Sequence, residues 1–523
     1  MMETHRRLSI IEEKGEEGAV EVIDLETLDQ DPLNDREASN SESHTLPTSK
    51  PTSSPANLTF ISVLQVIFGY ESPDPHNAPR PTAWLDGVRG LAALAVYIFH
   101  LSGAWTWLVP AWGATTEATN VMQLPLIRTI FVSGGAAVSV FFVLSGYVLT
   151  YSSLAKIRAG HEKRVYPAVA SSAFRRGFRL YLPVVALTFA ECVSTIFGFA
   201  PPLNFDFVPE PNAWCQLWDW IKETNRLINP FLDWERPIHG FVTHPKYDAV
   251  VWTIPLEFWG SMMCYILLLI LTQIPVPGIR MGLLGVCAVG FMSLGSWNMF
   301  CFASGVLIAD LNLGQMEDEP LSPLSLSRPV SKLQVRNLKP LWIVILVAGF
   351  YVAGFPTLSY HEEWERSMLG FETLRSLIPV SVDFEDHARF WWSISGVGML
   401  LSISQLSTMK RFFSRPILQY LGKISFSLYL VHEFCVELFG LKLQIFMQDF
   451  VGVEPKSGTI GYWLLAPVWV VAFSCCVFPI AAMVERWIDV PSVKFAKWFE
   501  ERSLKWVKSL RPVGYEFVER REY

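Results

Sequence analysis

The chain has 523 residues, of which 51% are hydrophobic and only 17% are charged. A soluble globular protein carries about 25% charged residues, and the 20 Trp and 36 Phe add apolar surface that a water-facing domain could not bury. This composition excludes a nucleic-acid-binding protein, a secreted disulfide scaffold and a cytosolic enzyme, and it indicates a polytopic membrane protein.

The N-terminal segment carries most of the net charge of −7. Residues 1–56 hold 13 acidic and 5 basic side chains, so the rest of the chain sums to about +1. The segment is polar, rich in Ser, Thr and Pro, and without hydrophobic periodicity. We therefore predict that residues 1–78 form a disordered acidic cytosolic tail. It lacks the basic and apolar regions of a signal peptide, so the first apolar helix should direct insertion.

Ten apolar windows follow in the chain. Because lipid admits only helices or closed barrels, and these runs are too long for barrel strands, we predict an all-α polytopic membrane protein with about ten transmembrane helices. The fifth and sixth windows are short and are separated by a predicted turn near Gly295 and Ser296. The windows are 84–108, 130–152, 180–200, 249–272, 281–296, 297–311, 340–356, 389–407, 417–440 and 460–484.

Loop charge predicts the orientation. With a cytosolic N-terminus, the inner segments hold 24 Lys and Arg and the outer segments hold 8, as the positive-inside rule requires. Both termini should therefore be cytosolic, with a membrane domain at 79–490 and a basic C-terminal tail at 491–523. The outer loops 201–248 and 357–388 are long and acidic, and could cap a site.

Cysteine usage gives no sign of a redox or metal framework. Of the eight Cys residues, only Cys215 lies in a hydrophilic loop, and no Cys or His spacing is typical of a zinc site. We expect neither structural disulfides nor a metal.

The first predicted helix carries two ionisable residues, Arg89 and His100. They are eleven residues apart, which returns them to nearly the same helix face about 16 Å apart. Arg89 could simply reach lipid phosphate, and His100 could be a neutral, satisfied core residue. Asp86 is too distant to orient His100, so we expect it to pair with Arg89 at i,i+3.

Three intramembrane residues are predicted to share one depth. His100, Glu257 and His432 each lie eight residues from the outer end of a predicted helix, or about 12 Å below the outer surface. This layer could be a polar network that holds helices together. It could also be an acid–base site in which Glu257 or Glu433 orients a histidine.

Two further patterns have both a structural and a functional interpretation. Arg175, Arg176 and Arg179 precede the third predicted helix; they could mark topology, or they could bind the phosphates of a cytosolic donor. The second helix is rich in small residues, which could serve close packing or leave a slot for a flexible cofactor arm.

Five segments of the sequence, taken together, resemble the acyltransferase-3 family of integral membrane acyltransferases. The resemblance covers about 80–490, and the wording of the fourth motif and the acidic N-tail are most similar to fungal members. The motifs are Leu85–Gly90 with His100 at an Arg-x10-His spacing, Phe141–Gly146 including Ser145, Arg175–Pro183, Trp252–Phe258, and Ser425–His432 including Tyr429.

The resemblance implies transfer of an acyl group, usually acetyl, from acyl-CoA to a hydroxyl. By position, His100 would be the catalytic base and Arg89 its partner near the donor. Arg175, Arg176 and Arg179 would face the CoA phosphates, while Glu257 and His432 occupy recurrent positions.

The acceptor implied for fungal members is a small molecule such as a terpenoid or polyketide. Other members act on glycans, sterols or lipids. An endomembrane such as the ER is the expected location.

Two other classes of function stay open on the residues alone. A proton-coupled transporter could use His100, Glu257 and His432 as a relay, and a scaffold or receptor would need none of them. Asn57 begins the glycosylation sequon of the chain, and we expect it to be unmodified because the N-terminus is predicted to be cytosolic.

Overall fold

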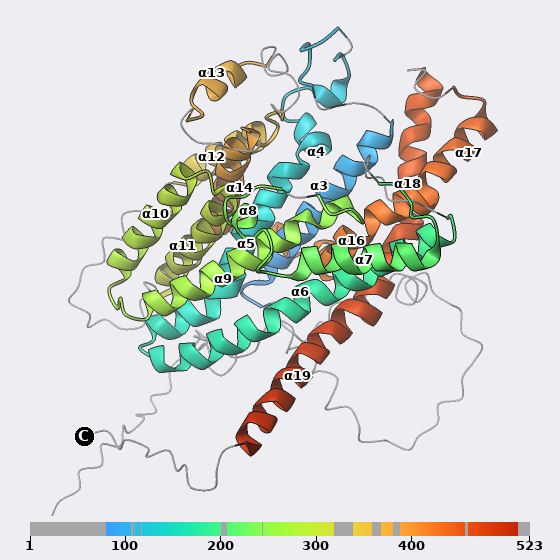
Figure 1. Ribbon diagram of the computed structural model, residues 1–523. Coiled ribbons are helices and arrows are strands. Elements are labelled where there is room, and N and C mark those ends of the chain that lie inside the picture. Colours follow the sequence, from blue (N-terminus) through green and yellow to red (C-terminus); the bar gives the residue numbers. More distant parts are fainter. Residues whose placement is uncertain are drawn as a thin grey trace, which may run out of the picture. The chain divides into compact units, whose positions relative to one another are not determined.

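The computed structural model describes residues 80–105, 108, 110–116, 118–199, 207–242, 244–317, 338–357, 368–379, 387–454 and 459–510. The predicted disordered tail and Asn57 lie outside these residues. The described part of the chain is helical and contains no strand. Figure 1 shows α10, α11, α12 and α14 on one side of α5, and α16 and α18 beyond α3 on the other.

The longer helices are connected by short 3-10 or π-helical segments and by loops that carry shorter helices. In chain order they are α3 (Ala83–Trp105), α5 (Gly134–Arg158), α6 (Val165–Ile196), α7 (Ala213–Ile228), α9 (Thr253–Leu271), α10 (Pro277–Ser293), α11 (Trp297–Glu317), α12 (Lys339–Ala353), α14 (Ala388–Gln405), α16 (Pro416–Cys435), α17 (Leu441–Val451), α18 (Ile460–Val484) and α19 (Val490–Ser509). The short ones are α4 (Arg128–Val132), α8 (Glu235–Ile238), α13 (Phe371–Ser376) and α15 (Ser407–Phe413).

Each of the ten predicted apolar windows contains a helix. Among the described residues, seven helical segments are long and apolar enough to cross a membrane, and α10 and α12 are shorter apolar helices. The turn predicted near Gly295 is confirmed: Gly295 has φ +78° and separates α10 from α11. The seven segments establish a polytopic membrane protein, whereas ten crossings and cytosolic termini stay predictions.

Two segments predicted as loop or tail are helical. The inner segment 153–179 is largely the end of α5 and the beginning of α6, with a short connection between them. Val165, Val169 and Leu180 are buried on α6; its arginines lower the mean hydropathy of this stretch and hide the helix from a search for apolar windows. The C-terminal segment from 491 continues α18 through a π-helical turn (Glu485–Asp489) into α19.

The helices α3 and α16 run parallel and touch through glycine. A Cβ atom added at Gly90 would lie 2.5 Å from the backbone nitrogen of Gly422, and one added at Gly422 would overlap the backbone of Asp86. Such contacts need residues without a side chain, because any Cβ would push the backbones apart. Ten positions further along both helices come His100 and His432.

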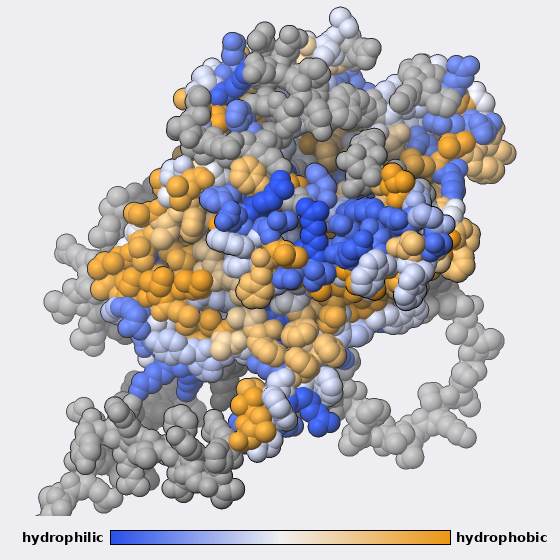
Figure 2. Space-filling model, in the orientation of Figure 1, coloured by the Kyte–Doolittle hydropathy of each residue, from blue (hydrophilic) through white to orange (hydrophobic). Residues whose placement is uncertain are grey.

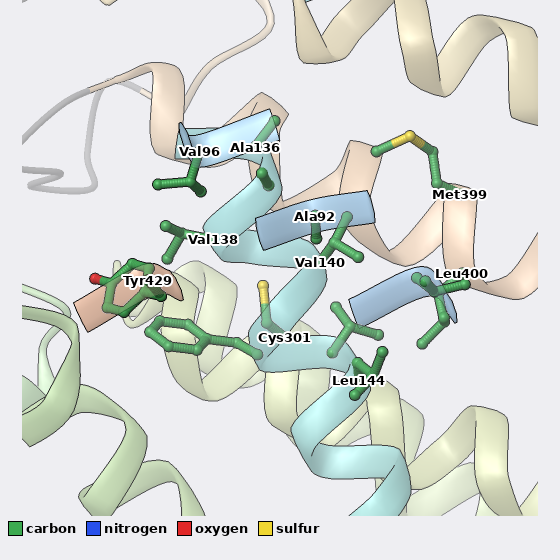
Figure 3. Close-up of a cluster of buried hydrophobic side chains, with 14 of the residues drawn as sticks. Ala92, Val96, Ala136, Val138, Val140, Leu144, Cys301, Met399, Leu400 and Tyr429 are labelled. Atoms are coloured by element: carbon green, nitrogen blue, oxygen red, sulfur yellow. The ribbon is translucent and has the colours of Figure 1, made fainter. Parts of the chain in front are cut away.

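Helix α5 packs at the centre of several neighbours. Figure 3 shows Val138 and Leu144 of α5 near Ala92 of α3, Cys301 of α11 and Leu400 of α14. The small residues of α5 serve this packing, since a Cβ at Gly146 would meet the Phe302 carbonyl and one at Gly135 would meet the Trp392 ring. At these two positions the small residues serve close packing; a slot for a cofactor arm stays a prediction.

The exposed surface separates into apolar and polar regions. Figure 2 shows apolar residues over α10 and polar residues over α7. On α10, Val286 and Val289 are 71% and 69% exposed, a pattern typical of lipid-facing helices, because apolar side chains cost nothing in hydrocarbon. The polar region belongs to the loop between α6 and α9.

We expect Gly90→Ala to destabilise the protein, because the added methyl group would force α3 away from the Gly422 backbone. Overpacking of this kind costs about 1–3 kcal/mol and should lower the thermal unfolding midpoint in detergent. Gly103→Ala is the control on the same helix: no atom lies within 4 Å of its Cβ position, so the midpoint should stay or rise. Equal midpoints for the two variants would contradict the close approach.

Candidate active site

The N-terminal part of α3 is held to α16 by Arg89. Its guanidinium donates to the Gly422 carbonyl oxygen at 2.7 Å, and Asp86 Oδ1 lies 3.2 Å from it at i,i+3. The predicted Asp86–Arg89 pair is therefore confirmed. The Ser425 hydroxyl also donates to the Gly422 carbonyl, at 2.8 Å, so two of the sequence-predicted residues share one acceptor. Arg89 keeps about a third of its side chain exposed.

Further along the same two helices, the two intramembrane histidines meet. The ring centroids of His100 and His432 are 5.0 Å apart, with an interplanar angle of 61°. His432 is fully buried, and Tyr97 and Tyr429 flank its ring at 6.3 and 6.1 Å. The sequence-based expectation that His100 and His432 share one layer agrees with this contact.

Tyr429 fastens α16 to the beginning of α9. Its hydroxyl donates to the Val250 carbonyl oxygen at 2.5 Å and lies 2.7 Å from the Thr253 hydroxyl, which can donate to it. The phenolic hydrogen of Tyr429 is thus already donated to a carbonyl that links the two helices. Tyr429 lies beside the histidine pair as a structural support, with its oxygen turned to α9.

Glu257 does not join the histidines through any described hydrogen bond; it pairs with an arginine. Arg176 of α6 donates to Glu257 Oε1 of α9 and, through Nε, to the Ser261 hydroxyl at 2.9 Å. The Ser145 side chain of α5 hydrogen-bonds the same carboxylate, and the Arg179 charge acts on it. The described bonds of Glu257 thus lead to Arg176 on a neighbouring helix, and a role for Glu257 in orienting a histidine stays a prediction.

Glu433, the other candidate for orienting a histidine, belongs to a different group of acids. Its charge acts on Asp248 and Glu191, and the Asp248 backbone nitrogen donates to Glu191 Oε2 at 2.8 Å. The groups that hold the His432 ring are backbone carbonyls: Nδ1 lies 2.8 Å from the Tyr429 oxygen and 3.1 Å from that of Leu428.

The three arginines predicted to bind phosphate lie on α6 but do not have the same surroundings. Adjacent positions on a helix point about 100° apart, and Arg175 accordingly turns away from Arg176. Arg175 Nε lies 3.3 Å from Glu500 Oε2 on α19. The two helices also pack through Phe174 and Phe499, whose rings stack at 6.0 Å. A phosphate-binding role for these arginines stays a prediction.

Two charged residues with close partners were not among the site residues predicted from the sequence. Asp310 of α11 is fully buried and accepts from Arg158 Nε at 2.7 Å and Arg280 Nη2 at 3.0 Å. Asp310 falls inside the predicted window 297–311, so the rule that singled out Glu257 would have found it.

The second missed residue is Arg389 at the N-terminal end of α14. Its guanidinium lies 4.9, 4.7 and 5.3 Å from the ring centroids of Trp252, Trp297 and Trp392. Trp252, a sequence-predicted site residue, therefore belongs to this aromatic cage. The sequence gives no local signal for the cage, because its members come from three separate segments: Trp252 before α9, Trp297 of α11, and Arg389 with Trp392 of α14.

The loop between α6 and α9 is folded onto the helices. Trp297 Nε1 donates to the Gly240 carbonyl at 2.8 Å, and Tyr247 donates to Asp219 Oδ2 at 3.1 Å. Burial, opposed by a hydrogen bond from Gln216, raises the pKa of the Tyr247 phenol, so its proton stays on. This loop, α6 and α9 form a pocket whose lining includes Tyr181, Trp252 and Trp259. His100 and His432 do not line it.

We expect Arg176→Met to destabilise the protein, because Glu257 would stay buried without its counter-charge. Breaking a buried pair costs about 3–5 kcal/mol, and the double variant Arg176→Met/Glu257→Leu should recover most of the loss. Unfolding in SDS measures both. Arg226→Met is the control, since its pair with Asp233 is half exposed and contributes about 0–1 kcal/mol. A single variant as stable as the double one would contradict the compensation.

Comparisons with known proteins bear on this arrangement. The family model described as "Acyltransferase domain" matches residues 82–485. O-acetyltransferase PaAT-1 of Phomopsis amygdali is 30% identical over 464 residues, covering 84% of this chain and 88% of the relative. Acyltransferase R4 of a Phoma species is 26% identical, covering 80% and 96%. Acyltransferase clz18 of Cochliobolus lunatus is 24% identical, covering 80% and 95%.

No solved structure matches the chain. The family match takes in all five sequence motifs and both histidines. The chain therefore belongs to the acyltransferase-3 family of membrane acyltransferases.

Proposed function

We propose that this acyltransferase is a membrane O-acetyltransferase that moves an acetyl group from acetyl-CoA to a hydroxyl of a small-molecule acceptor, with His100 as the general base. The contact between His100 and His432 in the helix bundle carries the proposal. An imidazole can accept a hydroxyl proton near neutral pH, and a buried site strengthens the electrostatics of the transfer.

The proposed reaction is a direct acyl transfer. The His100 ring takes the proton of the acceptor hydroxyl, and the oxygen attacks the thioester carbonyl carbon. The tetrahedral intermediate then expels the CoA thiolate, which takes the proton back from the His100 imidazolium. Arg89 is about 16 Å away along α3, so it serves the donor end and does not act on the reacting carbonyl.

The donor is proposed to enter from the cytosol. The excess of Lys and Arg on the predicted inner segments, 24 against 8 on the outer ones, would attract a polyanionic nucleotide. Arg175 and Arg179, together with Arg89, would face the CoA phosphates, whereas Arg176, which is paired with Glu257, would support them from inside the bundle. This orientation requires both termini to be cytosolic, in an endomembrane such as the ER.

The acceptor is proposed to be a fungal secondary metabolite, such as a terpenoid or polyketide. The support is the name of one relative, an O-acetyltransferase, and the fungal source of all three relatives reported above. A glycan, sterol or lipid acceptor is the alternative. Comparing the metabolites of strains with and without the protein by mass spectrometry would show a difference of one acetyl group on the acceptor.

We expect His100→Ala to abolish acetyl transfer while the protein still folds, because the variant lacks the ring that takes the hydroxyl proton. Loss of a general base costs about 100-fold to 10,000-fold. The assay measures label transferred from radioactive acetyl-CoA in membranes. Retained turnover in a normally expressed variant would remove this mechanism, and substrate uptake without acetyl-CoA consumption would favour a transporter.

We expect Arg175→Gln and Arg179→Gln to raise KM for acetyl-CoA, because each would remove a charge-assisted contact to phosphate. Such a contact contributes about 1.5–3 kcal/mol, or roughly 10-fold to 100-fold in affinity. Acetyl-pantetheine, which has no phosphates, should show an unchanged KM. Arg226→Gln in the outer loop is the control. An equal effect on both donors would contradict phosphate recognition.

A further inference from the structure

The protonation of His432 follows from its neighbours. Its Nδ1 atom faces two backbone carbonyl oxygens, of Tyr429 at 2.8 Å and of Leu428 at 3.1 Å. A carbonyl oxygen only accepts, so Nδ1 must carry the hydrogen. In the neutral ring, Nε2 then holds a lone pair. That atom is buried and has no hydrogen-bond partner within the described part of the chain.

Three rings surround His432, and they differ in whether they have a hydrogen to donate to Nε2. The Tyr97 hydroxyl is hydrogen-bonded with Ser474 at 2.8 Å, and the Tyr429 hydroxyl donates to the Val250 carbonyl. His100 is the nearest of the three rings, with centroids 5.0 Å apart, and it always carries at least one N–H. It is therefore the natural donor to the lone pair.

We infer that His432 is a positioning residue for His100: the two rings are already in contact, and when the acceptor binds, the His100 ring turns its N–H to the free Nε2 of His432. The other ring nitrogen of His100 then faces the acceptor hydroxyl as a base. The inference rests on the proposed function. It assigns to the second histidine the task that a carboxylate has in a Ser-His-Asp triad, which is to fix the tautomer of the base and to stabilise its protonated form.

A neutral partner suits this position in the bundle. An unpaired carboxylate beside a neutral His100 would be a costly charge in a dry, low-dielectric site. A histidine held by backbone carbonyls supplies the same acceptor without that charge. When His100 becomes an imidazolium during transfer, its bond to Nε2 becomes charge-assisted and shorter.

Two conservative variants separate the two nitrogens of His432. In His432→Asn the amide NH2 can donate to the Tyr429 carbonyl in place of Nδ1–H, but no acceptor atom stands at the position of Nε2. In His432→Gln the longer amide reaches the place of Nε2 and can accept from His100. We expect the Asn variant to lose about 10-fold to 100-fold in kcat with KM for acetyl-CoA unchanged, and the Gln variant to keep most of the wild-type kcat.

The assay uses the full chain in detergent, radioactive acetyl-CoA, and an extract of the deletion strain as the source of acceptor. Thermal midpoints confirm that each variant is folded, and His432→Gly with added imidazole provides a third measurement in which turnover should return. Full turnover of the Asn variant would overturn the inference. Loss of turnover in both variants without rescue by imidazole would also overturn it, in favour of a packing role.

The same experiment distinguishes this inference from the proposed function. If the wild-type protein transfers no acetyl group, the proposed function fails. If the wild type is active, His100→Ala is inactive and His432→Asn is fully active, only the positioning role fails. An Asn variant as inactive as His100→Ala would place His432 on the reacting atoms and would overturn the positioning role.

Discussion

The contact between the backbones of α3 and α16 sets the geometry of everything that follows in the site. Gly90 and Gly422 let the two parallel helices touch, and Arg89 closes the contact from the side by donating to the Gly422 carbonyl. Two parallel helices that start in register stay in register for a few turns. His100 and His432 each lie ten positions after these glycines, and their rings are therefore in contact. The short segments that hold the two helices together thus also align the histidines.

A second constraint is that two buried acids of the bundle, Glu257 and Asp310, are compensated by arginines on other helices. Glu257 is paired with Arg176, and Asp310 with Arg158 and Arg280. In hydrocarbon an uncompensated charge is expensive, so these pairs fix which helices are neighbours: α6 beside α9, and α5 and α10 beside α11. The histidine pair differs, since both rings can be neutral, and it can therefore accept and release a proton without breaking an ion pair that holds the fold.

The fold could be predicted largely from apolar windows, because each window became a helix. The site was predicted in part. His100 and His432 were found through depth alone, and Asp86 with Arg89 through helical spacing, both of which are local properties. The pairing of Glu257 with Arg176 could not be predicted, because depth within a helix does not say which neighbour a side chain faces. The aromatic cage of Arg389 was out of reach for the same reason: its tryptophans meet only through tertiary packing.

The helical segment from Ile460 to Ser509 has 50 residues, a contour of about 75 Å, whereas the hydrocarbon layer is about 30 Å thick. Much of this rod must therefore project beyond the bilayer, and its distal half lies along α6. A chain shortened at residue 490 would keep every predicted crossing and still lose the cover of Phe174 and the partner of Arg175. The C-terminal helix therefore forms part of the surroundings of α6, so a fusion or a truncation at that end would change the environment of Arg175.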